Sequence, residues 1–449
     1  MESKAPGTTL SSRIDSLPVK GWHWIMLTVC LLAIMFENYN QVSIAMAMPV
    51  IVRQWKLEMF NIGVLLSASS LGLLVGAIVF GIITDIFGRK AAFILTTLIF
   101  SFFVGLGALA QDFNSLYWLR VLAGLGLGGF IPVGQAYVSE YSPLPVRGRF
   151  LGIFSIGNGV GYCLTVIASM FLIPGSAEGW RYTFAIGGLG ILLLIPVITF
   201  LPESVRWLQT RGKFEEGVKI VEDLEQKILG KVTVPHDEAL EAAKQQAAQQ
   251  RGGGKKTSLA DFFKGDLVKA TILGSVLMLA ANYTFYGFIQ CMPTFLTQTL
   301  KFELTSGYGF TLIAAAFGTG TPGLAVGWMS DKIGRRWAMS IMMGLYAIAG
   351  FLFLAVSGWS ILLLYWFSSA MSSLLYIYVP ELFPTWLRGS GLGITGGIGR
   401  LAGFVAPMII GLTVAAAGLG GVITVNAIIL AVSILVIWII GIETKTVKA

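Results

Sequence analysis

Long apolar segments separated by short polar ones dominate the chain. Each apolar segment has about 20 residues or more, which is the length that an α-helix needs to cross the hydrocarbon core of a bilayer. The pattern therefore predicts an all-α integral membrane protein with twelve membrane-spanning helices. We expect these helices at residues 22–50, 59–83, 90–110, 115–139, 149–173, 180–201, 267–297, 305–329, 337–357, 360–380, 389–412 and 420–442.

One long polar stretch interrupts this pattern near the middle of the chain. It covers residues 202–266 and has the periodicity of charged helices, and its part from Gln245 to Lys256 has the Gln-, Ala- and Gly-rich composition of a mobile segment. The first apolar segment is too long for the core of a signal peptide, so we expect it to be retained as a helix. The predicted organisation is a tail at 1–21, a six-helix half at 22–201, a linker at 202–266, a second six-helix half at 267–442 and a tail at 443–449.

Charged residues are few, and their distribution predicts the orientation of the helices. Only 12% of the 449 residues are charged, against about 25% in ordinary soluble domains. The net charge of +8 would suggest nucleic-acid binding in a soluble protein, but here we attribute it to basic loops that face anionic lipid. Most lysines and arginines near helix ends fall on one side of the predicted membrane. Both termini and the linker are therefore expected on the cytoplasmic side of the cell membrane.

The sequence lacks the residue patterns of metal sites and of common enzymes. Cys30, Cys163 and Cys291 lie in apolar stretches without paired spacing, and His23 and His236 are the only histidines. We therefore predict no metal, no cofactor and no disulfide framework. No nucleophile–base arrangement or nucleotide-binding motif is found either, which argues against an enzyme or an ATP-driven pump.

A short polar motif occurs twice, each time between two apolar segments. The segment Gly81–Lys90 and the segment Gly327–Arg336 share the same order of glycine, acid, glycine and two bases. The repeat continues further along, because Glu140 and Glu381 are each followed seven positions later by an Arg-Gly pair. The chain is thus predicted to consist of two homologous membrane halves, and transporters built from such repeats bind their substrate between the halves.

These motifs resemble those of the major facilitator superfamily over nearly the whole chain. The sequence around Glu140 and Arg147, together with Pro202-Glu203-Ser204, is similar to the branch of sugar porters and organic-ion transporters. Within that branch, the glycine run 124–129 and the segment 378–385 look closest to bacterial aromatic-acid/proton symporters and nicotinate-type porters, which are related to the synaptic-vesicle-protein-like group. The resemblance implies a monomeric carrier that works by alternating access.

The same resemblance implies a cytoplasmic gate built from the repeated charges. It assigns this role to Asp85, Arg89, Asp331 and Arg335, with Glu140, Arg147, Glu381 and Arg388 as their partners. Charges at helix ends can lock two halves together and release them as the halves rock. The alternative is that the bases only anchor the topology and that the acids beside them are incidental.

Glu37 lies about 15 residues into the first predicted helix, far from either end. A charge at the bilayer centre costs roughly 2.5–3.5 kcal/mol on insertion scales, so such a residue normally faces a cavity or a partner. Asn40 and Gln41 follow at i+3 and i+4, which places all three on one face of the helix. We therefore expect a polar patch that lines the central cavity, although Glu37 can also serve only to hold two helices together.

Comparison with the family gives this patch a further interpretation. Proton-coupled members often carry an aspartate where this chain has Asn40, and nicotinate-type porters often carry an acid where it has Phe130. Glu37 matches a second acid of the aromatic-acid group, so it is the expected proton carrier if the protein is coupled to protons. Arg120 matches an arginine that tunes such an acid, which motivates a Glu37–Arg120 pair; alternatively, Arg120 is a positive anchor near the interface.

Arg400 is the strongest indication of the substrate. It lies about 11 residues into the eleventh predicted helix, among glycines that allow close approach of a neighbour. A guanidinium cannot lose its charge at this depth, so it requires an anion, and it can hold a carboxylate through two hydrogen bonds. Organic-anion members of the branch carry arginine at the position of Arg400. The alternative is a purely structural ion pair with Glu37.

Other polar and aromatic residues within the helices complete the candidate site. Rings with polar edges suit a flat aromatic acid, but tyrosines also gather at membrane interfaces without binding anything. Asn282, Tyr286 and Gln290 are the most informative of them, because their spacing places them in one stripe along a helix. The full set of candidates is Gln135, Asn158, Tyr162, Asn282, Tyr283, Tyr286, Gln290 and Tyr376.

Together, these observations predict a secondary active transporter for a small organic anion, such as an aromatic or other monocarboxylate. Uptake together with protons is the expected mode, and facilitated uniport of the same substrates is the alternative suggested by Asn40 and Phe130. A polyspecific efflux pump for drugs or organic cations would fit a cavity acid, but Arg400 argues against cations. A receptor that transports nothing would not need the gate motif in both halves.

Overall fold

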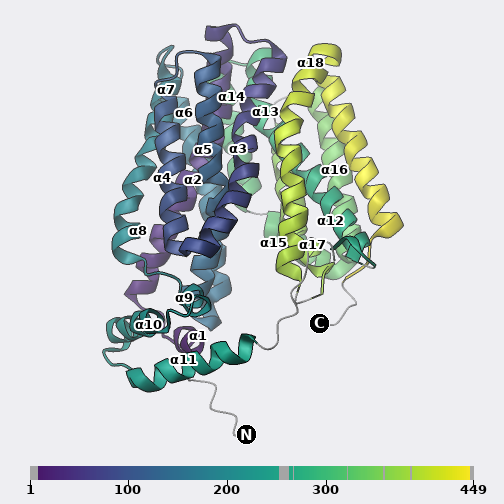
Figure 1. Cartoon of the computed structure of the whole chain (residues 1–449). Coiled ribbons are helices and arrows are strands. Elements are labelled where there is room, and N and C mark those ends of the chain that lie inside the picture. The colour runs from purple at the N-terminus through teal and green to yellow at the C-terminus, as the bar shows by residue number, and fades with distance from the viewer. Residues whose placement is uncertain are drawn as a thin grey trace.

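The computed structural model describes residues 9–251, 262–265, 267–320, 322–356, 359–384 and 387–444. Helices form every regular element within these ranges. Figure 1 shows two helical bundles side by side, with the short helices α9, α10 and α11 beneath the N-terminal bundle. The predicted all-α membrane fold is confirmed.

The N-terminal half contains six membrane-spanning segments. Their apolar sequences are long enough to cross a bilayer as helices, which satisfy their backbone hydrogen bonds internally. Five are single helices, and the sixth is α7, η2 and α8 in continuous succession. The elements are α2 (Gly21–Trp55), α3 (Met59–Phe87), α4 (Arg89–Gly107), α5 (Phe113–Tyr141), α6 (Arg147–Leu172), α7 (Gly179–Gly188), η2 (Leu189–Leu193) and α8 (Leu194–Phe200), with the short η1 (Leu144–Val146) before α6.

The C-terminal half repeats this plan with two local changes. Its first segment contains two π-helical stretches, η4 and η5, and its last two segments form the continuous α18. Gly418, with φ 65° and ψ −166°, turns the chain between those two segments in a conformation that favours glycine. The elements are α12 (Leu267–Asn282), η4 (Tyr283–Ile289), α13 (Gln290–Thr294), η5 (Phe295–Thr299), α14 (Leu304–Gly320), α15 (Pro322–Ile333), α16 (Arg335–Ala355), α17 (Ile361–Glu381) and α18 (Arg388–Ile440).

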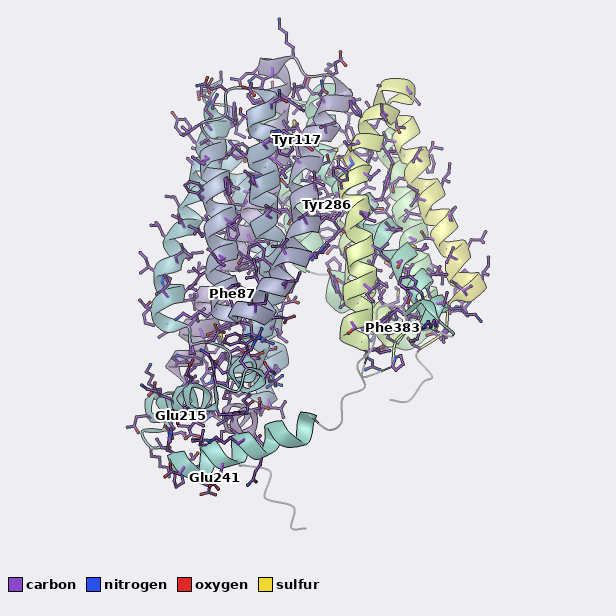
Figure 2. The ribbon with its side chains drawn as sticks, in the orientation of Figure 1. Phe87, Tyr117, Glu215, Glu241, Tyr286 and Phe383 are labelled. Carbon is purple, nitrogen blue, oxygen red and sulfur yellow. The ribbon has the colours of Figure 1, made fainter. Side chains whose placement is uncertain are left out.

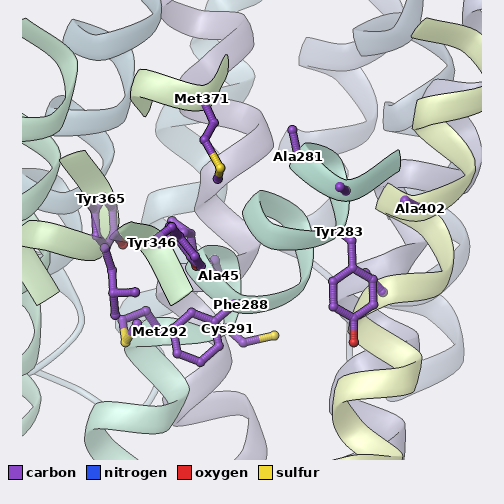
Figure 3. Packing of buried hydrophobic residues seen from close by; sticks show 14 of the residues in the cluster. Ala45, Ala281, Tyr283, Phe288, Cys291, Met292, Tyr346, Tyr365, Met371 and Ala402 are labelled. Carbon is purple, nitrogen blue, oxygen red and sulfur yellow. The ribbon is translucent and has the colours of Figure 1, made fainter. Parts of the chain in front are cut away.

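Two hydrophobic cores show how the halves meet. One core joins the C-terminal half to residues of the N-terminal half such as Met46, Leu65 and Phe184; Figure 3 shows part of it. Hydrogen bonds reinforce this junction, since Tyr308 donates to the Met46 carbonyl at 2.6 Å and Gln298 donates to the Pro49 carbonyl at 3.1 Å. The second core lies toward the linker and, among the described residues, contains none from the C-terminal half. The halves are therefore packed together at the end remote from the linker and diverge toward it (Figure 2).

Glycines bring α3 and α18 into backbone contact at the packed end. A Cβ added at Gly63 would overlap the carbonyl of Pro407, and one added at Gly411 would lie 2.5 Å from the carbonyl of Met59. These contacts cross from one half to the other. The packed state therefore depends on the absence of side chains at these positions.

Replacing Gly63 with tryptophan is expected to push the two halves apart at this end, because backbone on α18 cannot yield as a flexible side chain would. Spin labels on the loop residues Lys56 and Lys301 should then separate by several ångströms in pulsed electron paramagnetic resonance. Gly344→Trp on α16 is the control, since an added Cβ there meets nothing within 4 Å. Unchanged distances in the Gly63 variant would show that the junction does not depend on this contact.

The N-terminal segment and the linker form a small folded unit on the N-terminal half. It comprises α1 (Leu10–Asp15), α9 (Val205–Thr210), α10 (Phe214–Leu229) and α11 (His236–Arg251). Leu10 and Ile14 are buried, so the predicted tail at 1–21 contains a packed helix, α1. Of the predicted mobile segment 245–256, residues up to 251 belong to α11 and the remainder lies outside the described residues.

A buried ion pair fastens α1 to α10. The Arg13 guanidinium donates to both carboxylate oxygens of Glu225, at 2.8 and 2.7 Å, and Thr233 donates its backbone N–H at 2.8 Å and its hydroxyl at 2.6 Å to the same carboxylate. Burial acts to raise the pKa of Glu225, but these hydrogen bonds outweigh it and hold the pKa below its usual range.

Acidification should therefore release α1 from α10. A carboxylate with a depressed folded-state pKa stabilises the fold above its unfolded pKa of about 4.3, and this stabilisation is lost as pH falls through the folded value. Glu225→Gln should remove it at neutral pH as well, at a cost of about 3 kcal/mol for a broken buried pair. Amide exchange of α1, corrected for intrinsic rates, measures both effects. Equal protection of α1 in the variant and the parent at neutral pH would contradict the assignment.

Candidate functional site

A buried carboxylate on α2 faces an arginine of the other half. Glu37 is fully buried, and neither of its carboxylate oxygens has a hydrogen-bond partner among the described residues. Arg400 on α18 is half-buried and close enough for its charge to act on Glu37. The two do not form a direct ion pair, and Arg400 makes no hydrogen bond within the described part of the chain. The hydrogen-bond donors of this guanidinium are therefore not used by any described residue.

Tyr286 connects the two halves near these charges, and Figure 2 labels it where the two bundles adjoin. The Gln41 amide donates to its hydroxyl oxygen at 2.7 Å, which links α2 to η4 across the interface between the halves. Tyr286 is within electrostatic reach of Glu37, Arg400 and Tyr376. Its ring packs against Gly403, where an added Cβ would lie 3.0 Å from the ring. The absence of a side chain at Gly403 therefore leaves space for the tyrosine ring.

The π-helix η4 lies within the predicted stripe of Asn282, Tyr286 and Gln290. Tyr286 faces the central cluster. Gln290 lines the same small space as Gln41 and Tyr286, and it is buried with its side-chain Oε1 unpartnered among the described residues. Asn282 donates to the Met278 carbonyl at 2.7 Å and lies against Gly399, the neighbour of Arg400. Tyr283 is buried in the hydrophobic core (Figure 3). Such π-helical insertions are frequent at functional sites because they redirect side chains within a continuous helix.

The predicted common face of Glu37, Asn40 and Gln41 is divided in the structure. Asn40 is fully buried and donates to the carbonyl of Gly187 on α7 at 3.2 Å, where the missing side chain of the glycine leaves it room. Its side chain therefore turns away from the central cluster and connects helices within the N-terminal half.

The expected Glu37–Arg120 pair is also not observed. Arg120 is buried and donates to the Asn40 carbonyl at 2.9 Å and to the Ser69 hydroxyl at 2.9 Å. It thereby joins α2, α3 and α5 through neutral oxygens. In this conformation Arg120 holds the helices around Glu37 in place, and the charge that acts on Glu37 comes from Arg400.

The remaining candidates occupy different surroundings. Gln135 is exposed, and Asn158 accepts a hydrogen bond from Asn38 at 3.4 Å. The Tyr162 hydroxyl lies 3.0 Å from the Tyr365 hydroxyl and so connects α6 to α17. Tyr376 is 67% exposed and lies within electrostatic reach of Tyr286.

Sequence reasoning missed several polar residues next to these candidates. Tyr365 and three serines of α17 line a cavity of about 170 Å³ that also contacts Tyr162. The run Ser368-Ser369 followed by Ser372-Ser373 in an otherwise apolar helix was the available signal. Asn38 had a similar signal, since it directly follows Glu37 and Phe36 in an apolar segment and precedes Asn40 by two.

The repeated charges of the N-terminal half form a network at its linker end. Arg89 contacts Glu140 at 2.8 Å, and Glu140 also accepts from the hydroxyl of Ser204. Glu203 accepts from the backbone N–H groups of Arg89 and Lys90 at 2.8 and 3.0 Å. Its carboxylate thus caps the start of α4, where the helix dipole favours negative charge.

The C-terminal half builds the same network from other residues. Arg335 contacts Glu381 at 3.2 Å and Asp331 at 2.6 Å, and Glu443 accepts from the backbone N–H of Arg335 at 2.9 Å. Thr444 donates to Glu381 as Ser204 does to Glu140. Glu443 and Thr444 were expected in a terminal tail. Their similarity to Glu203-Ser204, directly after the last helix of the other half, was the sequence signal that could have identified them.

The other predicted gate residues have different partners. Asp85 is exposed, and its backbone carbonyl accepts from Trp207 and Arg211, both at 2.7 Å. Arg147 pairs with Asp15 of α1, and Arg388 makes no ion pair with a described residue. Every ion pair between described residues stays within one half and its attached segments, which agrees with the divergence of the halves at this end.

The sequence and the fold of this chain are similar to those of membrane transporters. The family model described as "Sugar (and other) transporter" matches residues 21–449. The niacin transporter NiaP of Acinetobacter baylyi is 29% identical, over 97% of this chain and 98% of that one. The 4-hydroxybenzoate transporter PcaK of the same organism is 28% identical, over 86% and 84% of the two chains. The inward-open structure of the xylose transporter XylE from E. coli has a TM-score of 0.73 at 19% identity, covering 95% of this chain and 98% of that one, which shows a shared fold.

Proposed function

The chain belongs to the sugar (and other) transporter family, and we propose that within it the protein carries a small aromatic monocarboxylate. It is a multi-pass membrane transporter and not an enzyme. The relatives named for niacin and 4-hydroxybenzoate support this substrate class, because both names denote a flat ring with a small polar or acidic substituent. The chain aligns with each of them over more than four fifths of its length.

The observation that carries the proposal is the guanidinium of Arg400, which pairs with none of the described residues. It is half-buried, it lies between the halves, and its charge acts on the carboxylate of Glu37, which is itself without hydrogen bonds to the described residues. A substrate carboxylate would supply the two acceptors that the guanidinium lacks. Tyr286 would then contact the ring of the substrate, and Gln41 would lie beside its carboxylate group.

The orientation of the protein in the membrane follows from the positions of its basic residues. We place the linker and both termini in the cytoplasm of a cell whose plasma membrane holds the protein, since Lys and Arg concentrate at that end. The structure is then open toward the cytoplasm and closed toward the outside. Rocking of the halves about the central cluster would give the opposite state, in which the Arg89 and Arg335 networks can meet partners across the interface.

Proton coupling follows from the competition of two carboxylates for one guanidinium. When substrate binds Arg400, the buried Glu37 loses the cation that compensates its charge, and a buried carboxylate without compensation is favoured in its protonated form. Substrate and proton would therefore bind together and leave together. This gives net uptake when protons flow inward.

Reconstitution into liposomes tests the proposal. Labelled 4-hydroxybenzoate should accumulate inside proteoliposomes above the external concentration when the lumen is alkaline, and collapse of the gradient by an ionophore should release it. Weak acids also cross lipid unaided, so protein-free liposomes under the same gradient set the baseline. Equilibration without accumulation above this baseline would identify a uniporter, which the neutral, hydrogen-bonded Asn40 favours as the second candidate.

A further inference from the structure

A second cavity lies between the halves beside the central cluster. Its volume is about 170 Å³. Four elements line it: α6 with Tyr162, η4 with Phe285 and Ile289, α14 with Ala315 and Gly318, and α17 with Tyr365 and three serines. Both halves therefore contribute to it, as a site used in alternating access requires.

The cavity combines aromatic walls with hydroxyl groups. Ser372 donates to the Ser368 carbonyl at 3.1 Å, so its hydrogen is already used within the helix. The hydroxyls of Ser368 and Ser369 make no hydrogen bond with a described residue, and Ser368 is only 3% exposed. Hydroxyls that line a cavity without using their own helix carbonyls are available to a ligand.

This cavity adjoins the central cluster. Tyr162, Phe285 and Ile289 also line a smaller space whose other walls include Gln41 and Tyr286. Tyr286 is in turn within electrostatic reach of Arg400. A ligand held at its carboxylate by Arg400 would therefore direct its other end past Tyr286 toward the serines.

We propose that this cavity receives the end of the substrate remote from its carboxylate, and that Ser368 and Ser369 select aromatic acids that carry a ring hydroxyl. The inference rests on the proposed transport of aromatic carboxylates and adds a preference within that class. Phe285 and Tyr162 contact the ring faces, and the serine hydroxyls exchange hydrogen bonds with the ring hydroxyl. A site built to hydrogen-bond a hydroxyl disfavours an analogue that lacks it, because the polar groups of the site are then left unpaired.

Binding of two probes to the purified full-length protein tests this selection. 4-Hydroxybenzoate and benzoate share the carboxylate and the ring and differ only in the hydroxyl. Their dissociation constants are measured by isothermal titration calorimetry for the parent, for Ser368→Ala, for Ser369→Ala and for the double variant. The parent is expected to bind 4-hydroxybenzoate about tenfold more tightly, and the double variant should lower this ratio to near one while leaving benzoate affinity unchanged.

Ser373→Ala is the matched control, because Ser373 lies on the same helix but donates to the Ser369 carbonyl at 3.0 Å and is not part of the cavity wall. A ratio that stays at its parent value in the double variant would overturn the serine assignment while leaving carboxylate transport intact. Loss of benzoate and 4-hydroxybenzoate binding together in that variant would also overturn it, since the serines would then support the fold rather than recognise the hydroxyl. If the parent binds neither acid, both the function and this inference are wrong.

Discussion

Arg400→Ala is expected to weaken the binding of an aromatic carboxylate about a hundredfold, or roughly 3 kcal/mol. The guanidinium supplies the only full positive charge that we assign to the substrate, and it is half-buried, where charge-assisted hydrogen bonds are strong. Calorimetric titration of the purified protein with 4-hydroxybenzoate measures the loss directly. Transport should fall in parallel at substrate concentrations below the parent dissociation constant.

Two further variants separate substrate binding from structure at this position. Arg400→Lys keeps the charge but loses the planar fork, so it should recover part of the affinity and not all of it. Arg388→Ala removes an arginine from the same helix near its first turn, and it should leave affinity unchanged. Affinity that is unaltered in both Arg400 variants would exclude the residue from the site and leave it as a structural companion of Glu37.

Glu37→Gln is expected to abolish accumulation driven by a pH gradient while substrate binding persists. Glutamine keeps the size of the side chain but carries no exchangeable charge, so the competition for Arg400 disappears. In proteoliposomes the variant should exchange labelled for unlabelled substrate at equal concentrations yet accumulate none above the protein-free baseline. Its affinity should also lose its dependence on pH, because the competing carboxylate is gone.

Glu37→Asp provides the corresponding control. It retains a carboxylate one methylene shorter, so accumulation should continue at a reduced rate. If Glu37→Gln accumulates substrate as the parent does, the proton must use another group, and the buried carboxylate is then only a link between helices. Equal loss of binding and accumulation in Glu37→Gln would indicate damage to the substrate site instead.

The fold could be predicted from the sequence because each of its determinants is local. Segment length sets the number of spanning helices, and the repeated motif around Asp85 and Asp331 shows that the two halves correspond. The central position of Glu37 and Arg400 in their helices also predicted that they would need each other or a ligand. Each of these arguments uses only the cost of burying charge or backbone in a membrane.

The parts that could not be predicted depend on helix rotation and on partners distant in sequence. Asn40 shares a nominal face with Glu37, but a glycine on α7 decides where it points. The π-helix η4 shifts the residues after Tyr283 by a fraction of a turn, which periodicity cannot reveal. Arg13 and Glu225 are separated by more than two hundred residues, and nothing in either segment indicates that they meet.

The π-helix η4 also bears on how this protein can change over evolution. A π-helical stretch is an α-helix with one residue added, so deletion of a residue within Tyr283–Ile289 would restore regular winding and turn every preceding side chain of α12 by about 100° relative to α13. Tyr286 would leave Gly403, and its link to Gln41 would be lost. In most loops a change of length is tolerated, but here it would displace residues of the proposed binding site. A comparison of segment length across the family should therefore separate carriers that share this geometry from those that do not.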